Sequence, residues 1–399
     1  MRIRRSIGAI VLSVAVVLLV AGCPTDLESN GRELPVLSDT HPNTFINAAE
    51  IRAIRWRVAA GSSPWRAAYD ALIERAEAAL DQEVLSVTFQ GSTSNDYFTQ
   101  RPYDWSNNMP SPCGETYCDG HINPEADRGD YEAAIAVGRS VRDLAVAYVL
   151  TGKNEYADKA ITLLLAWTVD PVTRMTPRYP NTQSRIELSI TMPGLFYGAD
   201  LIYEYPGWNP AEKALFLQWV DEFTSDARTS WSGSNNFENW RLVVVSTGGA
   251  LLKDQDHLDY AFERWRNLIS DQIGSDGRIL TELNRTRSLE YSTFAMNAMT
   301  QTAEVARQQG VNLYDYVDEN GRGLELVFDF HASYMLDPTQ WPYEQVTPYD
   351  GENAAIMELA FSFKQKQQYL DTILAWGRPM YEDRVMGITT LTHAFRGVH

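Results

Sequence analysis

The chain has 399 residues, of which 52 are acidic and 34 are basic, so its formal net charge is −18. A chain this acidic is not expected to bind nucleic acid, because it lacks a generally basic surface. A polyanionic ligand would need a locally positive cleft inside an acidic shell. The 11 Trp and 20 Tyr side chains are suited to stacking on sugar rings, although large cores use them as well.

The N-terminus has the pattern of an export signal. Arg2, Arg4 and Arg5 precede an apolar run over residues 7–20, which ends in small residues before Cys23. This pattern predicts a secretory signal peptide that is too short and wrongly flanked to remain as a membrane helix. Its end resembles a bacterial lipobox, in which the cysteine is lipidated and becomes the first mature residue. The alternative is an ordinary signal peptide with a chance cysteine.

We therefore expect a signal peptide over residues 1–22, a tether over residues 23–40 and a folded domain over residues 41–399. The protein would be exported, in the periplasm or anchored to the outer membrane, and would touch the membrane only through its lipid. Cys113 and Cys118 then remain as one possible pair. A closely spaced pair in an exported protein favours a disulfide over a metal site, since no Cys-x-x-Cys or His-rich cluster accompanies it.

Helix signals dominate the rest of the chain. Apolar residues recur at three- and four-residue spacing, and turn or capping residues bound the segments. Strand-like alternation is confined to short pieces such as residues 85–89. The pattern predicts helices over residues 47–60, 63–80, 131–150, 155–168, 187–205, 210–227, 236–252, 256–273, 291–309, 321–336, 352–361 and 365–376.

These helices, joined mostly by short turns, predict an all-α fold of stacked antiparallel hairpins. No fixed-period repeat is present, so a regular repeat array is not expected. An incomplete (α/α) toroid would gather loops around a central cleft; from periodicity alone, a right-handed solenoid or an irregular α-domain stays open. Residues 83–130 form a long polar and aromatic loop of the kind that binds or covers ligands, and its Trp105 and His121 could close over a substrate.

Polar and aromatic residues gather at helix ends in four stretches, over residues 119–125, 173–187, 234–241 and 282–291. In the last stretch, two arginines shortly precede Tyr291. Cations beside a tyrosine favour its ionised form, so we expect its pKa to be lowered from about 10. Such a tyrosine can take or give a proton. The alternative is a surface patch of Arg and Glu, with the tyrosine packed on the core.

An Asn-Asn-x-x-x-Trp motif is followed by Asp-Gly, by Glu-Leu-x-Arg-Thr-x-Ser-Leu-x-Tyr-Ser-x-Phe, and by Ala-Glu-x-Ala with Gly-x-x-Leu-Tyr. The residues are Asn235, Asn236, Trp240, Asp276, Gly277, Glu282, Leu283, Arg285, Thr286, Ser288, Leu289, Tyr291, Ser292, Phe294, Ala303, Glu304, Ala306, Gly310, Leu313 and Tyr314. With further matches over residues 144–148, 173–175 and 198–200, the chain resembles the alginate lyase superfamily over roughly residues 45–360.

The resemblance implies an (α/α) toroid and a periplasmic or secreted enzyme that cleaves uronic-acid polysaccharides by β-elimination. Alginate is the first expected substrate and glucuronan the next. No cofactor is expected, and the sequence offers no Gly-rich phosphate loop, nucleophile elbow or convincing metal-ligand cluster. The expected partner is an acidic polysaccharide.

β-Elimination requires a base that removes the C5 proton, a group that neutralises the adjacent carboxylate, and an acid that protonates the leaving C4 oxygen. The resemblance implies that Tyr291 is the acid and base, that Arg285 activates it and clamps substrate, and that Asn236 neutralises the carboxylate. Candidate substrate-binding residues are Asn235, Asn239, Arg241, Arg287, Arg174, Tyr179, Gln183 and His121. For residues 174–183 the alternative is a helix-end hydrogen-bond cluster, and Trp240 is expected in the core.

The chain departs from the superfamily at Phe237, where a histidine commonly follows Asn-Asn. The residues that could take over its role are His121, His331, Asn239, Arg241 and, if protonated, Glu238. Otherwise Tyr291 would perform both proton transfers, which suits a syn elimination.

Two other classes of function stay open. A non-catalytic glycan-binding surface protein is favoured by Phe237 and the lipid anchor. A glycoside hydrolase on the same toroid would use a pair of carboxylates, for which the candidates are Glu187, Glu282 and Asp200.

Overall fold

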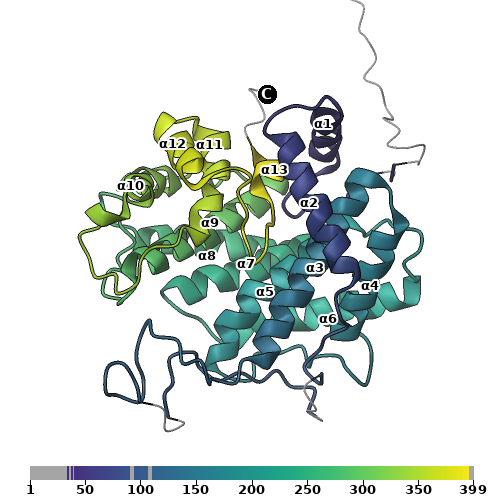
Figure 1. Ribbon diagram of the computed structural model, residues 1–399, viewed down its shortest axis with the longest axis horizontal. Helices are drawn as coiled ribbons and strands as arrows, with labels where there is room; N and C mark the ends of the chain where they lie inside the picture. The colour runs from purple at the N-terminus through teal and green to yellow at the C-terminus, as the bar shows by residue number, and fades with distance from the viewer. Residues whose placement is uncertain (1–33, 36, 39, 90–93, 107–109, 395–399) are drawn as a thin grey trace, which may run out of the picture.

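The computed structural model describes residues 34, 35, 37, 38, 40–89, 94–106 and 110–394 (Figure 1). The expected signal peptide, Cys23 and most of the expected tether lie outside the described residues. The helices are α1 Ala48–Ala59, α2 Trp65–Leu80, α3 Gly129–Thr151, α4 Asn154–Thr168, α5 Thr182–Leu201, α6 Pro210–Thr229, α7 Asn236–Leu252, α8 Gln255–Gln272, α9 Ser288–Gln308, α10 Leu324–Leu336, α11 Met357–Lys364, α12 Gln367–Trp376 and α13 Thr389–His393, with 3₁₀ turns at Pro338–Gln340 and Glu352–Ile356.

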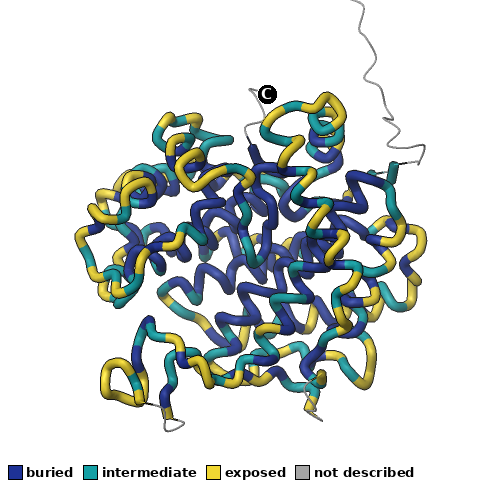
Figure 2. The backbone as a smooth tube through the Cα atoms, in the orientation of Figure 1, coloured by how far each residue is buried: buried dark blue, intermediate teal, exposed yellow. Residues whose placement is uncertain are grey.

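Helices α3, α5, α7 and α9 lie side by side as an inner layer, and α2, α4, α6, α8 and α10 pack against them from outside. The inner helices are buried on almost every face, including polar residues such as Asn297 and Gln301 of α9, whereas exposed residues gather at the rim (Figure 2). Close approach of α3 and α5 depends on small residues: a Cβ at Gly198 would lie 2.8 Å from the carbonyl oxygen of Val141. The expected all-α incomplete (α/α) toroid is confirmed.

The helix starts differ from the expected ones where caps extend them. Helix α5 begins at Thr182, because Asn181 forms a capping box with Ser184. Helix α9 begins at Ser288, because loop groups satisfy its first N–H donors: the Ser288 N–H donates to the carbonyl oxygen of Glu344. Residues 352–361 divide into a 3₁₀ turn and the start of α11.

Within the described ranges, β-structure is limited to isolated bridges, and residues 85–89 form irregular chain and a turn instead of a short strand. No helix in this part of the chain is long and apolar enough to cross a membrane. After α12 the chain returns to the N-terminal helices, where α13 lies against α1 and α2 (Figure 1). The segment between α12 and α13 carries Arg384, which lines a cleft with residues of the inner helices.

Candidate active site

A cleft of about 430 Å³ opens where the N-terminal ends of all four inner helices meet the loop before α3. Tyr131 comes from α3, Glu187 from α5, Asn236 from α7 and Tyr291 from α9, and Tyr103 from the loop closes the opposite wall. The N-terminal end of a helix carries partial positive charge, so four of them pointing at one space favour an anionic ligand.

Tyr291 lies at the centre of this arrangement. Its hydroxyl is 2.5 Å from the hydroxyl of Tyr103, and the guanidinium carbon of Arg285 is 3.7 Å from the centre of its ring. Burial and the neighbouring Tyr103 raise the pKa of Tyr291 well above its usual value, and Arg285 only partly opposes them. The expectation of a lowered pKa was wrong, because the cation stacks on the ring face while the ring itself is desolvated.

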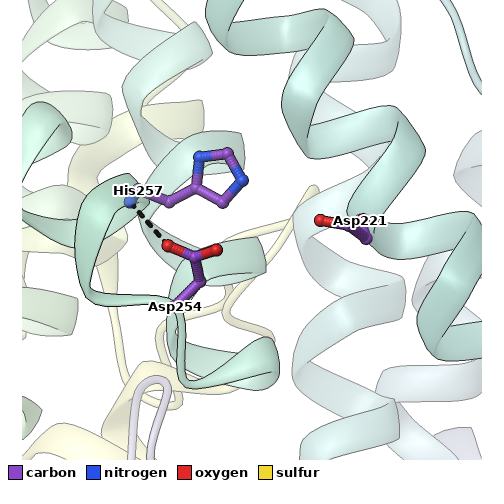
Figure 3. A group of neighbouring side chains, drawn as sticks. All are labelled: Asp221, Asp254 and His257. Carbon is purple, nitrogen blue, oxygen red and sulfur yellow. Dashed lines mark hydrogen bonds between the residues drawn. The ribbon is translucent and has the colours of Figure 1, made fainter.

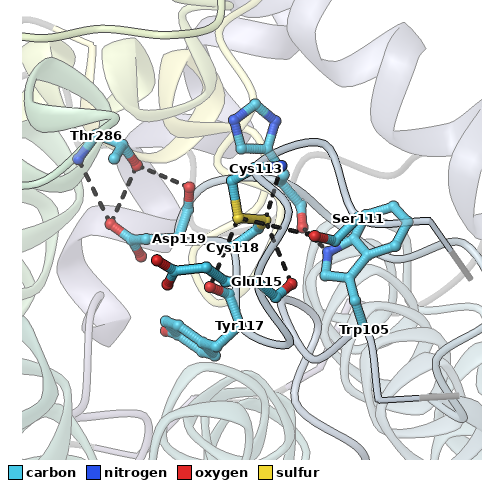
Figure 4. The surroundings of a disulfide bond; sticks show 9 residues. Trp105, Ser111, Cys113, Glu115, Tyr117, Cys118, Asp119 and Thr286 are labelled. Atoms are coloured by element: carbon cyan, nitrogen blue, oxygen red, sulfur yellow. Dashed lines mark hydrogen bonds between the residues drawn. A yellow bond between two sulfur atoms is a disulfide. The ribbon is translucent and has the colours of Figure 1, made fainter. Parts of the chain in front are cut away.

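Arg285 is held by the loop. Its Nη2 and Nε donate to the two oxygens of Asp119 at 2.7 and 3.1 Å, a bidentate pair. The hydroxyl of Thr286 also donates to Asp119, at 3.0 Å (Figure 4). The remaining Nη1 of Arg285 lies 3.9 Å from Glu282. The bidentate pair with Asp119 therefore fixes the guanidinium plane of Arg285 over the Tyr291 ring.

Asn236 is fixed from behind by Glu282. The backbone N–H and the side-chain amide of Asn236 donate to the two oxygens of Glu282 at 2.9 and 2.8 Å. Burial raises the pKa of Glu282. Phe237 follows in the cleft wall together with Phe294, so an apolar surface lies beside the asparagine.

The lining mixes both signs of charge. Its arginines are Arg101, Arg128, Arg285, Arg287 and Arg384, and its carboxylates are Glu187, Glu290, Asp350 and Glu352. Burial, together with Asp350 and Glu352, raises the pKa of Glu290 to about 7. The lining therefore becomes more positive when Glu290 takes up a proton.

Two groups of side chains in the described residues have the composition of a cation site. Oxygens of Glu290, Asp350 and Glu352 lie within 4.8 Å of one another in the cleft. Asp221, Asp254 and His257 form the other group (Figure 3), and none of them lines the cleft. There Asp254 caps α8 by accepting from the backbone N–H of His257, so helix capping explains its position.

Comparison with known proteins gives a family and a fold. The model of the alginate lyase family matches residues 87–341. The chain belongs to the alginate lyase family. No curated protein matches the sequence.

Solved alginate lyases have the same fold as this family member. A structure of an alginate lyase from Bacteroides ovatus is 22% identical, with a TM-score of 0.76, over 89% of this chain and 99% of the other. Alginate lyase A1-III from Sphingomonas species A1 is 21% identical, with a TM-score of 0.61, over 86% of this chain and 94% of the other. A variant of A1-III complexed with a tetrasaccharide gives 20% identity and a TM-score of 0.64, over 88% and 95%.

The cleft brings together part of the residue set that the family resemblance implied. The predicted residues that line it are Tyr291, Arg285, Asn236, Arg287 and Gln183. The side-chain amide of Gln183 donates to Glu187 at 3.0 Å, one turn along α5.

Asn239 and Arg241 do not line the cleft. Both are buried: the Asn239 amide donates to Gln272 at 2.9 Å, and the Arg241 Nε donates to Glu238 at 2.8 Å. Burial disfavours the charge of Glu238, but its bonds from Arg241 and Arg264 prevail and lower its pKa. The prediction of Asn239, Arg241 and Glu238 as carboxylate-binding groups was wrong, because all three are buried: Arg241 and Glu238 form an ion pair one helical turn apart, and Asn239 is bonded to Gln272.

Asn235, Arg174 and Tyr179 also lie outside the lining. Asn235 caps α7 by accepting from the N–H of Phe237 at 3.2 Å. Arg174 is exposed. The Tyr179 ring packs on Phe223, and its hydroxyl is 3.0 Å from that of Ser189. For Tyr179 the helix-end hydrogen-bond cluster is the better interpretation, whereas Gln183 of the same region lines the cleft.

Neither proposed substitute histidine enters the cleft. His331 is buried beside Trp341, and its Nδ1 lies 2.8 Å from the carbonyl oxygen of Val327. Burial lowers its pKa to about 4. His121 lines an adjoining depression of about 360 Å³ with Trp105 and Arg287. It is thus a neighbour of the cleft, whereas Trp240 is fully buried in the core, as expected.

The carboxylates suggested for a hydrolase do not form one group. Asp200 is held among His41, Asn43 and Thr44, at 2.7 to 2.8 Å, and does not line the cleft. Glu282 lies behind Asn236. Glu187 accepts a hydrogen bond from the hydroxyl of Tyr97 at 2.6 Å and forms an ion pair with Arg128.

Sequence reasoning missed several lining residues, namely Arg101, Tyr103, Tyr117, Arg128, Tyr131, Glu290, Asp350, Glu352 and Arg384. Glu290 adjoins Tyr291 in the recognised motif, and the tyrosines of the long loop were visible as aromatic residues in a polar segment. Nothing in the local sequence marked Arg384, which lies beyond the matched residues and reaches the cleft only through the path of the C-terminal segment.

Proposed function

We propose that this member of the alginate lyase family is a polysaccharide lyase that cleaves a uronic-acid polymer by β-elimination, with alginate as the first expected substrate and glucuronan as the next. The observation that carries the proposal is the placement of Tyr291, Arg285 and Asn236 in one cleft at converging helix N-termini. This arrangement supplies the acid–base group, the cation and the amide donor that the reaction requires.

In the proposed reaction, the amide of Asn236 and nearby arginines bind the uronate carboxylate and stabilise the negative charge that develops when C5 loses its proton. Tyr291 takes that proton in its ionised form. The C5–H electrons form the C4–C5 double bond, the C4–O bond breaks, and the leaving oxygen takes a proton from Tyr291. One tyrosine on one face of the sugar therefore serves both steps, as a syn elimination allows.

Tyr291 must lose its own proton before it can act as a base, and its raised pKa opposes this loss. The hydroxyl of Tyr103, 2.5 Å away, is positioned to accept a hydrogen bond and pass the proton toward solvent, because Tyr103 is only half-buried. The stacked Arg285 stabilises the phenolate that remains.

Because Phe237 stands where a histidine commonly follows Asn-Asn, this position supplies no imidazole to neutralise the substrate carboxylate. Other cations therefore have to neutralise it. Arg384 is the candidate in the cleft lining: its Nη1 forms an ion pair with Glu352, its Nε is buried without a hydrogen-bond partner, and its guanidinium lies 5.0 Å from the Phe294 ring. We propose that Arg384 binds a substrate carboxylate together with Asn236.

The test is the ultraviolet absorbance of the unsaturated product on mannuronan, guluronan and glucuronan, with Tyr291→Phe beside the wild type. A lyase gives absorbing products that the variant does not form. Reducing ends without absorbance would indicate a hydrolase. Binding without either product would favour a glycan-binding protein, the alternative that the apolar Phe237 supports.

We also propose that the protein is exported and anchored by a lipid on Cys23, on the sequence pattern before that cysteine. Metabolic labelling with a radioactive fatty acid should mark the wild type and not Cys23→Ser. Equal labelling of both would contradict the anchor.

A further inference from the structure

The loop before α3 contains a small hairpin that reaches Tyr291 in two ways. In this hairpin, formed by residues 102–105 and 116–119, the Trp105 N–H donates to the carbonyl oxygen of Thr116 at 2.7 Å and the Cys118 N–H donates to that of Tyr103 at 3.0 Å. A disulfide between Cys113 and Cys118 closes its turn (Figure 4). The cysteine that is backbone-paired with Tyr103 is thus also the neighbour of Asp119.

Both arms of the hairpin end on the same catalytic tyrosine. One arm carries Tyr103, whose hydroxyl meets that of Tyr291. The other carries Asp119, whose carboxylate holds Arg285 through two hydrogen bonds, and Arg285 stacks on the Tyr291 ring. Burial disfavours the charge of Asp119, but the bonds from Arg285 and Thr286 prevail and lower its pKa.

The approach of the hairpin to α9 requires the glycine after Asp119. Gly120 has a φ of +78°, and a Cβ there would lie 2.6 Å from the hydroxyl oxygen of Thr286. A side chain at this position would push the hairpin away from Thr286 and Arg285. The close contact is therefore built into the sequence on both sides, by Gly120 in the loop and by Thr286 beside the arginine.

We propose that Asp119 is a positioning residue for the elimination and that the Cys113–Cys118 disulfide keeps it in place, so that activity depends on the oxidised disulfide. The proposal rests on the proposed function of Tyr291. Asp119 acts through Arg285: its two hydrogen bonds fix the guanidinium plane on the Tyr291 ring. A disulfide that closes so short a loop adds less to global stability than one that closes a long loop, so we expect its main effect to be local. Reduction by an added dithiol would break the S–S bond and yield two thiols, while the dithiol becomes a disulfide.

The experiment compares Asp119→Asn and the double variant Cys113→Ser/Cys118→Ser with the wild type, with and without dithiol. The matched control is Glu115→Gln, an exposed carboxylate of the same loop. We expect kcat to fall about tenfold or more in Asp119→Asn, in the double variant and in the reduced wild type, because small misplacements of catalytic groups are costly. KM should change much less, and the control should keep wild-type values.

The pH dependence of kcat/KM distinguishes a positioning role of Asp119 from a direct effect of its charge on Tyr291. Asp119 itself raises the pKa of Tyr291 and Arg285 lowers it. If Asp119 positions Arg285, its loss displaces the arginine, and the rise of kcat/KM with pH moves to higher pH in Asp119→Asn. If Arg285 stays in place, removal of the negative charge moves the rise to lower pH, which would overturn the proposal.

The proposed clamp is the arrangement in which Asp119 and the disulfide hold Arg285 against Tyr291. Hydrogen–deuterium exchange tests this clamp without any reaction. Amides of residues 285–291 should exchange faster in Asp119→Asn and in the double variant than in the wild type or Glu115→Gln. Unchanged exchange would overturn the clamp. If the wild type and both variants cleave the polymer equally well, the clamp is refuted and the lyase function stands. If the wild type cleaves no polymer, the lyase function is refuted, and the exchange result alone decides whether the clamp exists.

Discussion

Two clusters of charged side chains, both involving α9, differ in how fully their hydrogen bonds are satisfied. The seam cluster, made of Glu50, Glu304, Arg307 and His393, joins α1, α9 and α13. Arg307 Nη2 lies 2.7 Å from both Glu50 and Glu304, and His393 Nε2 lies 3.2 Å from Glu304. Burial opposes the charge of Glu304, but Arg307 and His393 prevail and hold its pKa well below the usual range.

The cleft cluster, made of Arg287, Glu290, Asp350, Glu352 and Arg384, is left incomplete. Oε2 of Glu290, Nε of Arg287 and Nε of Arg384 are buried without hydrogen-bond partners. Buried polar groups without partners are unfavourable in a finished core. The seam cluster completes its hydrogen bonds within the chain and serves stability, whereas the cleft cluster retains bonding capacity for the carboxylates and hydroxyls of the proposed polyuronate substrate.

The largest effect should come from removing the hydroxyl of Tyr291. We expect Tyr291→Phe to lower kcat by about 10³-fold, within the range for loss of a general acid–base group, and to leave the melting temperature nearly unchanged. Tyr334→Phe, which removes a hydroxyl on α10, is the matched control and should keep full activity. Kinetics on polyuronate and thermal unfolding of the same samples measure both effects. An active Tyr291→Phe would show that another group moves the protons.

A change in the seam cluster should lower stability and leave activity almost unchanged, the opposite of the effect of Tyr291→Phe. Arg307→Met removes the shared cation of Glu50 and Glu304 and leaves Glu304 with its contacts to His393 and Tyr314; removing one partner of a buried ion pair costs about 3–5 kcal/mol. We expect urea unfolding to show a loss of this size, while the kcat of the molecules that remain folded stays within about twofold. A fall in kcat larger than the loss of folded protein would contradict the division between the two clusters.

The pH dependence of stability should have opposite signs in the two clusters. The pKa of Glu290 is raised from 4.5 to about 7, so its contribution to stability is present below about pH 4.5 and is lost as pH rises through about 7. That contribution is about 3 kcal/mol. The pKa of Glu304 is lowered, so its contribution is present above the ordinary glutamate pKa and is lost as pH falls.

Glu290→Gln separates these two contributions. The variant should lose the decline in unfolding free energy between about pH 4.5 and 7 and keep the acid-side decline due to Glu304. Urea unfolding at closely spaced pH values measures both limbs. The idea fails if Glu290→Gln retains the same decline toward neutral pH as the wild type.

Periodicity and capping signals were sufficient to predict α1 to α12 but not the five-residue α13, which is too short to show a periodic pattern. The motif around Tyr291 and Asn236 was also sufficient to place two walls of the cleft. It could not distinguish Arg241 from a ligand-binding arginine, since its pairing with Glu238 depends on which face of α7 is buried. Local patterns also could not reveal Tyr103 or Arg384, because a long loop and the C-terminal segment bring them to the cleft only when the ring closes.

The smallest predicted effect concerns Phe237. A histidine there would place an imidazole beside Asn236 in the cleft wall, and an ordinary imidazole is cationic below about pH 6.5. We expect Phe237→His to lower KM for polyuronate about threefold relative to the wild type at about pH 5.5, and to lose this advantage above about pH 7.5 as the ring becomes neutral. Phe237→Gln is the uncharged control, and KM measured as a ratio to the wild type at each pH removes the titration of Glu290 from the comparison. Equal ratios for the two variants at every pH would show that no substrate carboxylate lies next to this position, and that Asn236 and the arginines bind it elsewhere in the cleft.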